Sequence, residues 1–479
     1  PTELQFIHDP PGKQARADLT WTRPAEKNRE FGVQIAPRSK RKAEIAHVGF
    51  SKAMFCSSFN AAVRPSFTAH SIASSASMAA YHDGAFAVAP MMDYTNQFLR
   101  FLLRRITAKS TLYTEMVTAN TIVHCGESEL PRFLDHDGEA EQPLVLQVGG
   151  ADPEMLRRAA EIAEPWGFTA LNLNCGCPSD RVAGSGCFGA ALMREPKLVA
   201  DCCAALADGA SGRLPVTVKC RIGVTNDKAN AAKVDDEATY AELAQFVDTV
   251  SREGNVRNFI VHARKAVLGG LSPAQNRQVP PLRYNLVHRL SREFPELYFS
   301  LNGGVDTIDQ ASHHLRYDDS DGSSKLSGVM SGRSVIARPW DFATVDTQLY
   351  RASSDPATSR RQVLNAYAEY CDATEARIPQ RVRHLLIASA VNLFAGEPHG
   401  KQFRRAVDQH GKGIPAAQVL LNAAEEALLP ETLDAPPGHQ WDHRERAYLS
   451  REEWLRVGAE RASEKLAEES AAAAAAATG

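Results

Sequence analysis

Short apolar runs alternate with amphipathic stretches between residues 85 and 345. The runs show almost no polar alternation, which is typical of strands buried on both faces of a parallel sheet. The stretches between them, such as 152–167 and 238–254, carry apolar residues at helical spacing. We expect strands at 85–90, 111–116, 143–150, 170–176, 216–223, 258–264, 297–304 and 326–333.

Eight strand–helix units in about 250 residues match the size and rhythm of a (β/α)8 TIM barrel. The pattern therefore predicts an α/β barrel domain at 85–350, with a doubly wound open sheet as the alternative. The strand runs stop after residue 350, and 359–378 and 416–429 show helical patterns. We expect a small all-helical domain at 351–465, followed by a low-complexity, alanine-rich tail at 466–479.

Residues 1–84 have a different composition from the rest of the chain. Residues 37–42 form a basic cluster, and 54–81 contain no acidic residue, one arginine and many serines and alanines. This composition is typical of an organelle transit peptide, and equally of a disordered extension. It predicts a chloroplast or mitochondrial location if the segment is a transit peptide, and a cytoplasmic location otherwise.

The overall composition limits the kinds of partner that we expect this chain to bind. No run of about 18 apolar residues occurs, so no membrane partner is expected. Nine cysteines without regular spacing favour a reducing compartment over a disulfide framework. The net charge of −3 does not by itself indicate nucleic-acid binding, but residues 381–412 are locally basic. Their cations are Arg381, Arg383, Lys401, Arg404, Arg405 and Lys412.

Polar residues follow the expected strands, where a barrel places its catalytic groups. The turns NGG (302–304) and SGR (331–333) end the last two strands, and barrels often bind a phosphate there. Glycine lets the backbone approach an anion, and Arg333 would add a charge-assisted contact. The alternative is two tight turns that need glycine for their backbone conformation.

A phosphate site at this end of the barrel would place Lys219 and Gln147 beside the body of the cofactor. A cation there stabilises the negative charge of a reduced flavin, so the pattern predicts flavin mononucleotide, FMN. No GxGxxG fingerprint follows an early strand, which argues against a resident NAD or FAD on a Rossmann fold.

The segment NLNCGCPSD (172–180) raises the question of what Cys175 and Cys177 do. A zinc site is poorly supported because the chain has no CxxC pair. A single catalytic thiol on a glycine-rich loop beside a flavin fits better. Alternation along an extended strand puts both cysteines on the same side, so the pattern alone does not choose between them.

The chain resembles the tRNA-dihydrouridine synthases. It is most similar to their A-type branch, which is associated with D-loop uridines 20 and 20a, and to the plant and algal relatives of that branch. The resemblance runs in order over about residues 85–410. The segments that carry it are APMMDYT (89–95), LYTEMVTANTIVH (112–124), LQVGG (146–150), LNLNCGCPSDRV (171–182), FGAALM (188–193), VTVKCRIG (216–223), VHARKAVLGGLSPAQNRQVPPL (261–282) and SLNGGV (300–305).

The resemblance implies an FMN-bound barrel, a helical tRNA-binding domain, and NADPH-dependent reduction of the C5–C6 double bond of uridine. It implies that Cys177 donates the proton to C5 and that Asn174, Gln275 and Gln278 contact tRNA. Arg404 and Arg405 of the basic segment are expected to contact RNA phosphates. No metal and no stable protein partner are expected, so the chain should be a monomer. The implied FMN contacts are Pro90, Met91, Met92, Gln147, Lys219, His262, Asn302, Gly303, Gly304, Gly332 and Arg333.

The chain also departs from the family pattern. Cys175 stands where the family has an apolar residue, and the loop after Cys177 is one residue longer, with Cys187 in place of a common arginine. Extra residues occur at 225–235 and 317–325, and the segment 381–405 is longer. Individual tRNA contacts of the helical domain therefore cannot be assigned by resemblance.

Two other functions remain as alternatives. One is an FMN-dependent barrel oxidoreductase that reduces a small-molecule pyrimidine, and the basic segment argues against it because such an enzyme needs no RNA-gripping domain. The other is a catalytically inactive RNA-binding protein, and the intact set of Cys177, Lys219, His262 and Arg333 argues against that.

Overall fold

The computed structural model describes residues 81–178, 188–229, 232–319, 322–378, 382–410 and 413–478. The expected transit-like extension lies outside these residues, apart from its last four positions. The same holds for residues 179–187, which include Cys187. Within the described residues no helix is long and apolar enough to cross a membrane.

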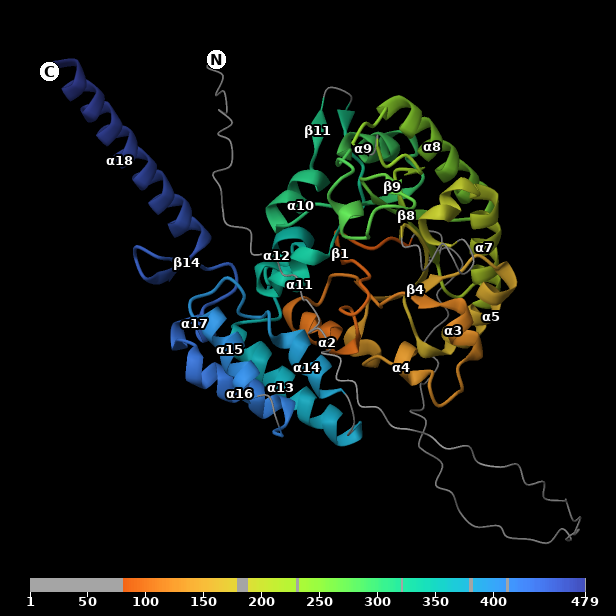
Figure 1. Cartoon of the computed structure of the whole chain (residues 1–479), viewed down its shortest axis with the longest axis horizontal. Coiled ribbons are helices and arrows are strands. Elements are labelled where there is room, and N and C mark those ends of the chain that lie inside the picture. The colour runs from red at the N-terminus through yellow and green to blue at the C-terminus, as the bar shows by residue number, and fades with distance from the viewer. Residues whose placement is uncertain are drawn as a thin grey trace, which may run out of the picture. The chain divides into compact units, whose positions relative to one another are not determined.

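The centre of the fold is a parallel sheet whose strands lie inside a ring of helices (Figure 1). Its order is β1-β13-β10-β8-β6-β5-β4-β2, and all its strand pairs are parallel. The strands are β1 (Phe86–Val88), β2 (Leu112–Tyr113), β3 (Val117–Thr118), β4 (Leu144–Gly149), β5 (Ala170–Cys175), β6 (Val216–Arg221), β8 (Asn258–His262), β10 (Tyr298–Asn302) and β13 (Gly328–Ser331).

The sheet closes between β1 and β2. Val88 N donates to Thr111 O at 2.9 Å, and Thr111 N donates to Phe86 O at 3.1 Å. The predicted (β/α)8 barrel is therefore confirmed, and the open sheet is excluded. One detail differs from the expectation: the run at 111–116 forms only the short β2, a separate short strand, β3, follows it, and both pair with β4.

Helices follow the strands as the amphipathic pattern predicts. The stretch at 152–167 forms α5, which begins at Pro153 after the capping side chain of Asp152, and 238–254 lies in α8. The helices around the sheet are α2 (Gln97–Ile106), α3 (Ala119–His124), α4 (Pro131–Leu134), α5 (Pro153–Ala163), α7 (Pro196–Gly209), α8 (Asp236–Glu253), α9 (Tyr284–Glu293), α10 (Ile308–Leu315), α11 (Arg333–Ala337) and α12 (Val345–Tyr350).

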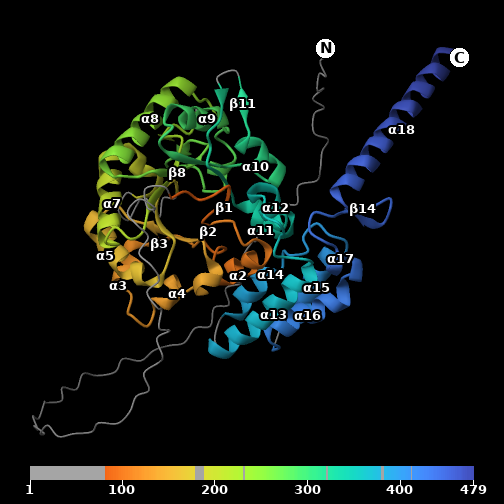
Figure 2. The same cartoon turned by 180° about the vertical axis from the view of Figure 1, so that it is seen from behind.

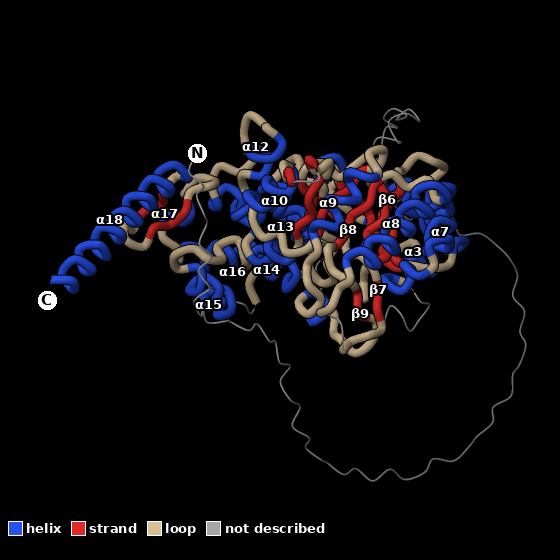
Figure 3. The backbone as a smooth tube through the Cα atoms, turned by 90° about the horizontal axis from the view of Figure 1, so that it is seen from above, coloured by secondary structure: helices blue, strands red, loops and turns tan. Residues whose placement is uncertain are grey.

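Two short strand pairs within residues 224–323 lie outside the barrel sheet. β7 (Val224–Thr225) pairs in parallel with β9 (Ala266–Val267), and Figure 3 shows them side by side. β11 (Asp318–Asp319) pairs with β12 (Gly322–Ser323) in the region where the sequence has extra residues.

Helices also dominate the chain after the barrel. We call residues 360–434 the helical segment; it comprises α13 (Arg360–Arg377), α14 (Arg383–Ala390), α15 (Gly400–His410), α16 (Ala416–Ala427) and α17 (Pro430–Asp434). A hairpin, β14 (Gln440–Asp442) and β15 (Ala447–Leu449), follows it and was not expected. The last helix, α18 (Arg451–Thr478), runs through the alanine tail, because alanine is the best helix former.

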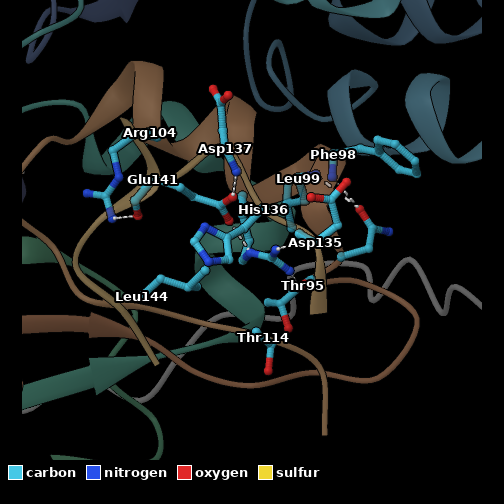
Figure 4. Close-up of polar contacts among 12 residues, drawn as sticks. Thr95, Phe98, Leu99, Arg104, Thr114, Asp135, His136, Asp137, Glu141 and Leu144 are labelled. Atoms are coloured by element: carbon cyan, nitrogen blue, oxygen red, sulfur yellow. Dashed lines mark hydrogen bonds and ion pairs between the residues drawn. The ribbon is translucent and has the colours of Figure 1, made fainter. Parts of the chain in front are cut away.

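The helical segment packs on α2 of the barrel, and Figure 2 shows α14 beside it. The contact is largely apolar: the Phe101 ring stacks on Tyr370 of α13 with centroids 3.9 Å apart. On its barrel side, α2 is held by Arg100, which forms a buried ion pair with Glu141. Arg104 Nη2 donates to the backbone oxygen of Glu141 at 3.0 Å (Figure 4). α2 is thus fixed between the barrel and the helical segment.

Candidate active site

The carboxyl ends of β6 and β10 place Lys219 and Asn302 together inside the barrel. Lys219 Nζ donates to Asn302 Oδ1 at 2.9 Å, and Asn302 Nδ2 donates to Met330 O of β13 at 2.9 Å. Burial, and next the charge of Arg221, lower the pKa of Lys219 to about 8. A cation held in this way gains free energy from any anion that lies beside it.

A second set of polar side chains crosses the barrel from β4 to β6. Gln147 Nε2 donates to Asn172 Oδ1 at 2.8 Å, and Asn172 Nδ2 donates to Thr217 Oγ1 at 2.8 Å. Asn174 Nδ2 reaches Gln147 Oε1 at 3.3 Å. These buried amides fix one another's orientation, because each donor has an acceptor.

The turns after β10 and β13 lie next to each other because the two strands pair, with Asn302 opposite Met330. Gly303 and Gly304 have φ of 109° and 70°, which favours glycine. Each also lacks room for a side chain: a Cβ on Gly303 would meet His262 Nε2 at 3.0 Å, and one on Gly304 would meet Leu282 at 2.7 Å. Both the backbone conformation and the packing therefore require glycine at these two positions.

The two cysteines of the CGC segment differ in environment. Cys175 is the last residue of β5, has no exposed surface and lies opposite Cys220 of β6. Burial, and then the nearby Cys203, raise the pKa of its thiol well above the usual range. Cys177 is half-buried. Within the described residues, no three His, Cys, Asp or Glu side chains are arranged to hold a metal ion.

The backbone around Cys177 is held on both sides. Asn174 Oδ1 accepts hydrogen bonds from Gly176 N at 2.9 Å and from Cys177 N at 3.1 Å. Arg221 Nε donates to Gly176 O at 3.0 Å, and Ala190 N donates to Cys177 O at 2.9 Å. The regular strand ends at Cys175, so Cys177 does not follow the alternation of β5.

Several cationic side chains lie near the Cys177 thiol, although the whole chain has a net charge of −3. The Cys177 thiol interacts electrostatically with Arg221 and Arg277. Arg333 interacts in the same way with Arg264 and Arg277. Burial, and then the surrounding cations Arg221, Lys219, Arg264 and Arg333, lower the pKa of His262 well below its usual value. His262 is therefore neutral at pH 7, and the mouth of the barrel favours anions.

The loop after β1 lines the same mouth. Asp93 has φ of 67°, and Thr95 Oγ1 accepts from Met91 N at 3.0 Å, which closes a tight turn. The turn leaves two large side chains exposed, Met92 at 54% and Tyr94 at 52%. A Cβ on Gly332 would meet Met91 Sδ at 3.1 Å, so this loop and the turn after β13 are neighbours.

Comparison with known proteins shows to which family this barrel belongs. The family model for dihydrouridine synthase (Dus) matches residues 87–429. The chain belongs to the dihydrouridine synthase family. It is 42% identical over 342 residues, 71% of this chain and 92% of the relative, to a tRNA-dihydrouridine(20/20a) synthase of Xylella fastidiosa (strain 9a5c).

Relatives with the same name occur in other bacteria. One from Salmonella typhimurium is 40% identical over 342 residues, which is 71% of this chain and 93% of that protein. One from Xanthomonas axonopodis pv. citri is 43% identical over 343 residues, covering 71% of this chain and 92% of that protein. The resemblance to the 20/20a branch of the tRNA-dihydrouridine synthases, read from the motifs, is thus confirmed.

The residues predicted to contact FMN surround one mouth of this dihydrouridine synthase. Gln147 and Lys219 lie in the carboxyl-terminal halves of β4 and β6, His262 and Asn302 are the last residues of β8 and β10, and the glycine turns follow β10 and β13. Pro90 is half-buried next to the exposed Met92, and Arg333 is exposed at the start of α11.

The residues predicted to contact tRNA divide into three groups. Asn174 is buried and holds the backbone of Cys177. Gln275 and Gln278 are exposed on the loop after β9. Arg405 is exposed on α15, whereas Arg404 Nη2 donates to Asn392 Oδ1 at 2.8 Å and is half-buried.

Three cations of the mouth, Arg221, Arg264 and Arg277, were not among the predicted site residues. Arg221 Nη1 donates to Asn276 O at 3.0 Å, so its guanidinium joins the Cys177 loop to the loop that carries Gln275. Arg277 is half-buried near Cys177. The signal for Arg277 was in the sequence, since it is the only charged residue of 272–282.

Proposed function

We propose that this chain reduces the C5–C6 double bond of uridine in tRNA, with FMN as cofactor and NADPH as the reductant. The target is the D-loop uridine at position 20 or 20a, as the names of its relatives state for them. The observation that carries the proposal is the half-buried thiol of Cys177, held rigidly within a mouth lined by cations.

The residues at the mouth fit FMN. The glycine turns at 303–304 and 332, with Arg333, would hold the phosphate, and Lys219, Gln147 and His262 would hold the ring system. One observation supports a polar ligand here: among the described residues, His262 Nδ1 is buried without a hydrogen-bond partner. Buried polar atoms rarely remain unpaired, so a bound group would complete this site. When bound, FMN supplies the hydride that is added to C6 of the uracil.

Cys177 supplies the second hydrogen. Its Sγ holds a proton and transfers it to C5 as C6 receives the hydride, and the thiolate that remains is reprotonated from solvent. An acid in this role needs no lowered pKa, unlike a cysteine nucleophile. Asn174 and Arg221 fix the backbone on which the thiol is carried. Cys175 cannot take this role, because its side chain is fully enclosed.

The cations also suit the substrate. A uridine in tRNA must leave its stack to reach a thiol inside a barrel mouth. Arg277 and Arg333 offer charge to the flanking phosphates or to the cofactor, and the exposed Gln275 and Gln278 lie on the adjacent loop. The exposed Arg405 of the helical segment offers a further phosphate contact.

The test is a single turnover of the FMN-loaded full chain, reduced by NADPH, on tRNA that lacks dihydrouridine. Cys177→Ala should accept electrons from NADPH normally but reduce uridine at least about a hundredfold more slowly, the lower range for losing a general acid. Cys175→Ala, the matched control, should stay near wild type. A wild-type chain that binds no FMN, or that reduces free uridine but not tRNA, would refute the proposal.

A further inference from the structure

One polar contact joins the helical segment to the helix that follows the last strand. Asn392, just after α14, donates from Nδ2 to the backbone oxygen of Ile336 in α11 at 2.9 Å. On its other side, Asn392 Oδ1 accepts from Arg404 Nη2 of α15 at 2.8 Å. Both ends of the amide are thus used, and the guanidinium fixes which way the amide points.

The surroundings make this contact close and rigid. The two residues after Asn392, Leu393 and Phe394, are each 1% exposed. Phe394 packs edge-on against Phe403, the neighbour of Arg404, with ring centroids 4.9 Å apart. Gly396, with φ of 90°, lies so near Arg338 that a Cβ would meet its guanidinium at 2.9 Å. Unseating Asn392 from α11 would therefore disturb the packing of Phe394 as well.

The carbonyl that Asn392 holds is one helical turn from the proposed phosphate site. Ile336 N donates to Gly332 O at 3.2 Å, so α11 starts directly at Gly332 and Arg333. The packing of the helical segment on α2, such as the stacking of Phe101 on Tyr370, lies on α2 and not on α11. The amide contact is directional and is made to α11 itself, so it orients the start of that helix.

We infer that Asn392 is a positioning residue that couples tRNA binding by the helical segment to FMN retention at the start of α11. Arg404 acts through Asn392 rather than on an RNA phosphate. The inference rests on the proposed function, because it takes FMN and tRNA as the two ligands. Each ligand binds more tightly to the arrangement in which Asn392 is seated on α11, so each strengthens the other by the same factor.

The experiment measures that factor in the full chain. FMN affinity is taken from the quenching of flavin fluorescence, with and without saturating unmodified tRNA, and tRNA affinity is measured with and without FMN. In the wild type, tRNA should lower the Kd for FMN about tenfold, within the range usual for coupled sites, and FMN should lower the Kd for tRNA equally. In Asn392→Ala, both ratios should fall to about one.

Three variants separate coupling from general damage. Asn392→Asp still pairs with Arg404 but cannot donate to Ile336, so it should also lose the coupling, and it replaces the alanine variant if that one unfolds. Arg404→Ala should match Asn392→Ala, whereas Arg405→Ala should weaken tRNA binding and keep the coupling. Asn285→Ala, which loses an exposed hydrogen bond to Asp236 of the barrel, should resemble the wild type.

A wild-type chain whose two ligands bind independently would overturn the inference, as would Asn392→Asp with the full wild-type ratio. These outcomes differ from failure of the proposed function, in which the wild type binds no FMN or leaves uridine unreduced.

Discussion

Replacing Lys219 by Met tests whether the positive charge inside the barrel strengthens the binding of FMN. Among the residues that the structure describes, no carboxylate interacts with Lys219. Its hydrogen-bond partner is the neutral amide of Asn302, and Arg221 lies near. Its pKa is about 8 instead of 10.5. This difference corresponds to about 3 kcal/mol of disfavoured charge, at 1.36 kcal/mol for each pKa unit. An anionic ligand that pairs with the ammonium group would recover much of it.

The direction in which pH changes the Kd for FMN follows from proton binding by Lys219. At pH 8 about half of the free chains carry a neutral Lys219, and at pH 9 about nine-tenths do. If bound FMN restores the ordinary pKa, binding takes up about half a proton at pH 8 and about 0.9 at pH 9. The Kd for FMN should therefore rise above pH 8, approaching tenfold for each pH unit.

Calorimetry in two buffers of different ionisation enthalpy measures the proton uptake directly. Lys219→Met should bind FMN about ten- to a hundredfold more weakly, the range for losing a charge-assisted hydrogen bond, and should show no uptake at pH 9. Lys197→Met, on the exposed side of α7, is the matched control and should behave like the wild type. A wild-type Kd that is constant from pH 7 to 9.5, or equal uptake in Lys219→Met, would refute the reasoning.

Three further predictions concern RNA binding and stability. Arg405→Ala should reduce the slope of log Kd against log salt for tRNA by about one, measured by salt titration of filter binding. Glu397→Ala leaves the fully buried guanidinium of Arg360 without its carboxylate, so it should cost about 3–5 kcal/mol in urea unfolding. Burial raises the pKa of Asp83 to about 6, so its contribution to stability is greatest below pH 4 and is lost as the pH rises through 6. The difference in urea midpoint between pH 4.5 and 7.5 should therefore shrink in Asp83→Asn.

The sequence by itself determined the barrel and its chemically active end. Strands buried on both faces need apolar residues throughout, so all eight runs were visible without the structure. Parallel strands bring their carboxyl ends to one edge, so Lys219, His262 and Asn302 could be placed together from their positions in the chain. The motifs around Cys177 were specific enough to indicate the family.

Only the tertiary structure decided what depends on contacts distant in sequence. Alternation gave Cys175 and Cys177 the same environment, whereas the structure buries Cys175 at the end of β5 opposite Cys220 and leaves Cys177 half-buried beyond the strand. The hydrogen bond from Arg404 on α15 to Asn392, just after α14, joins two separate elements and has no local sequence signal. Arg221 links two loops through backbone oxygens, which carry no sequence signal, because every residue has one.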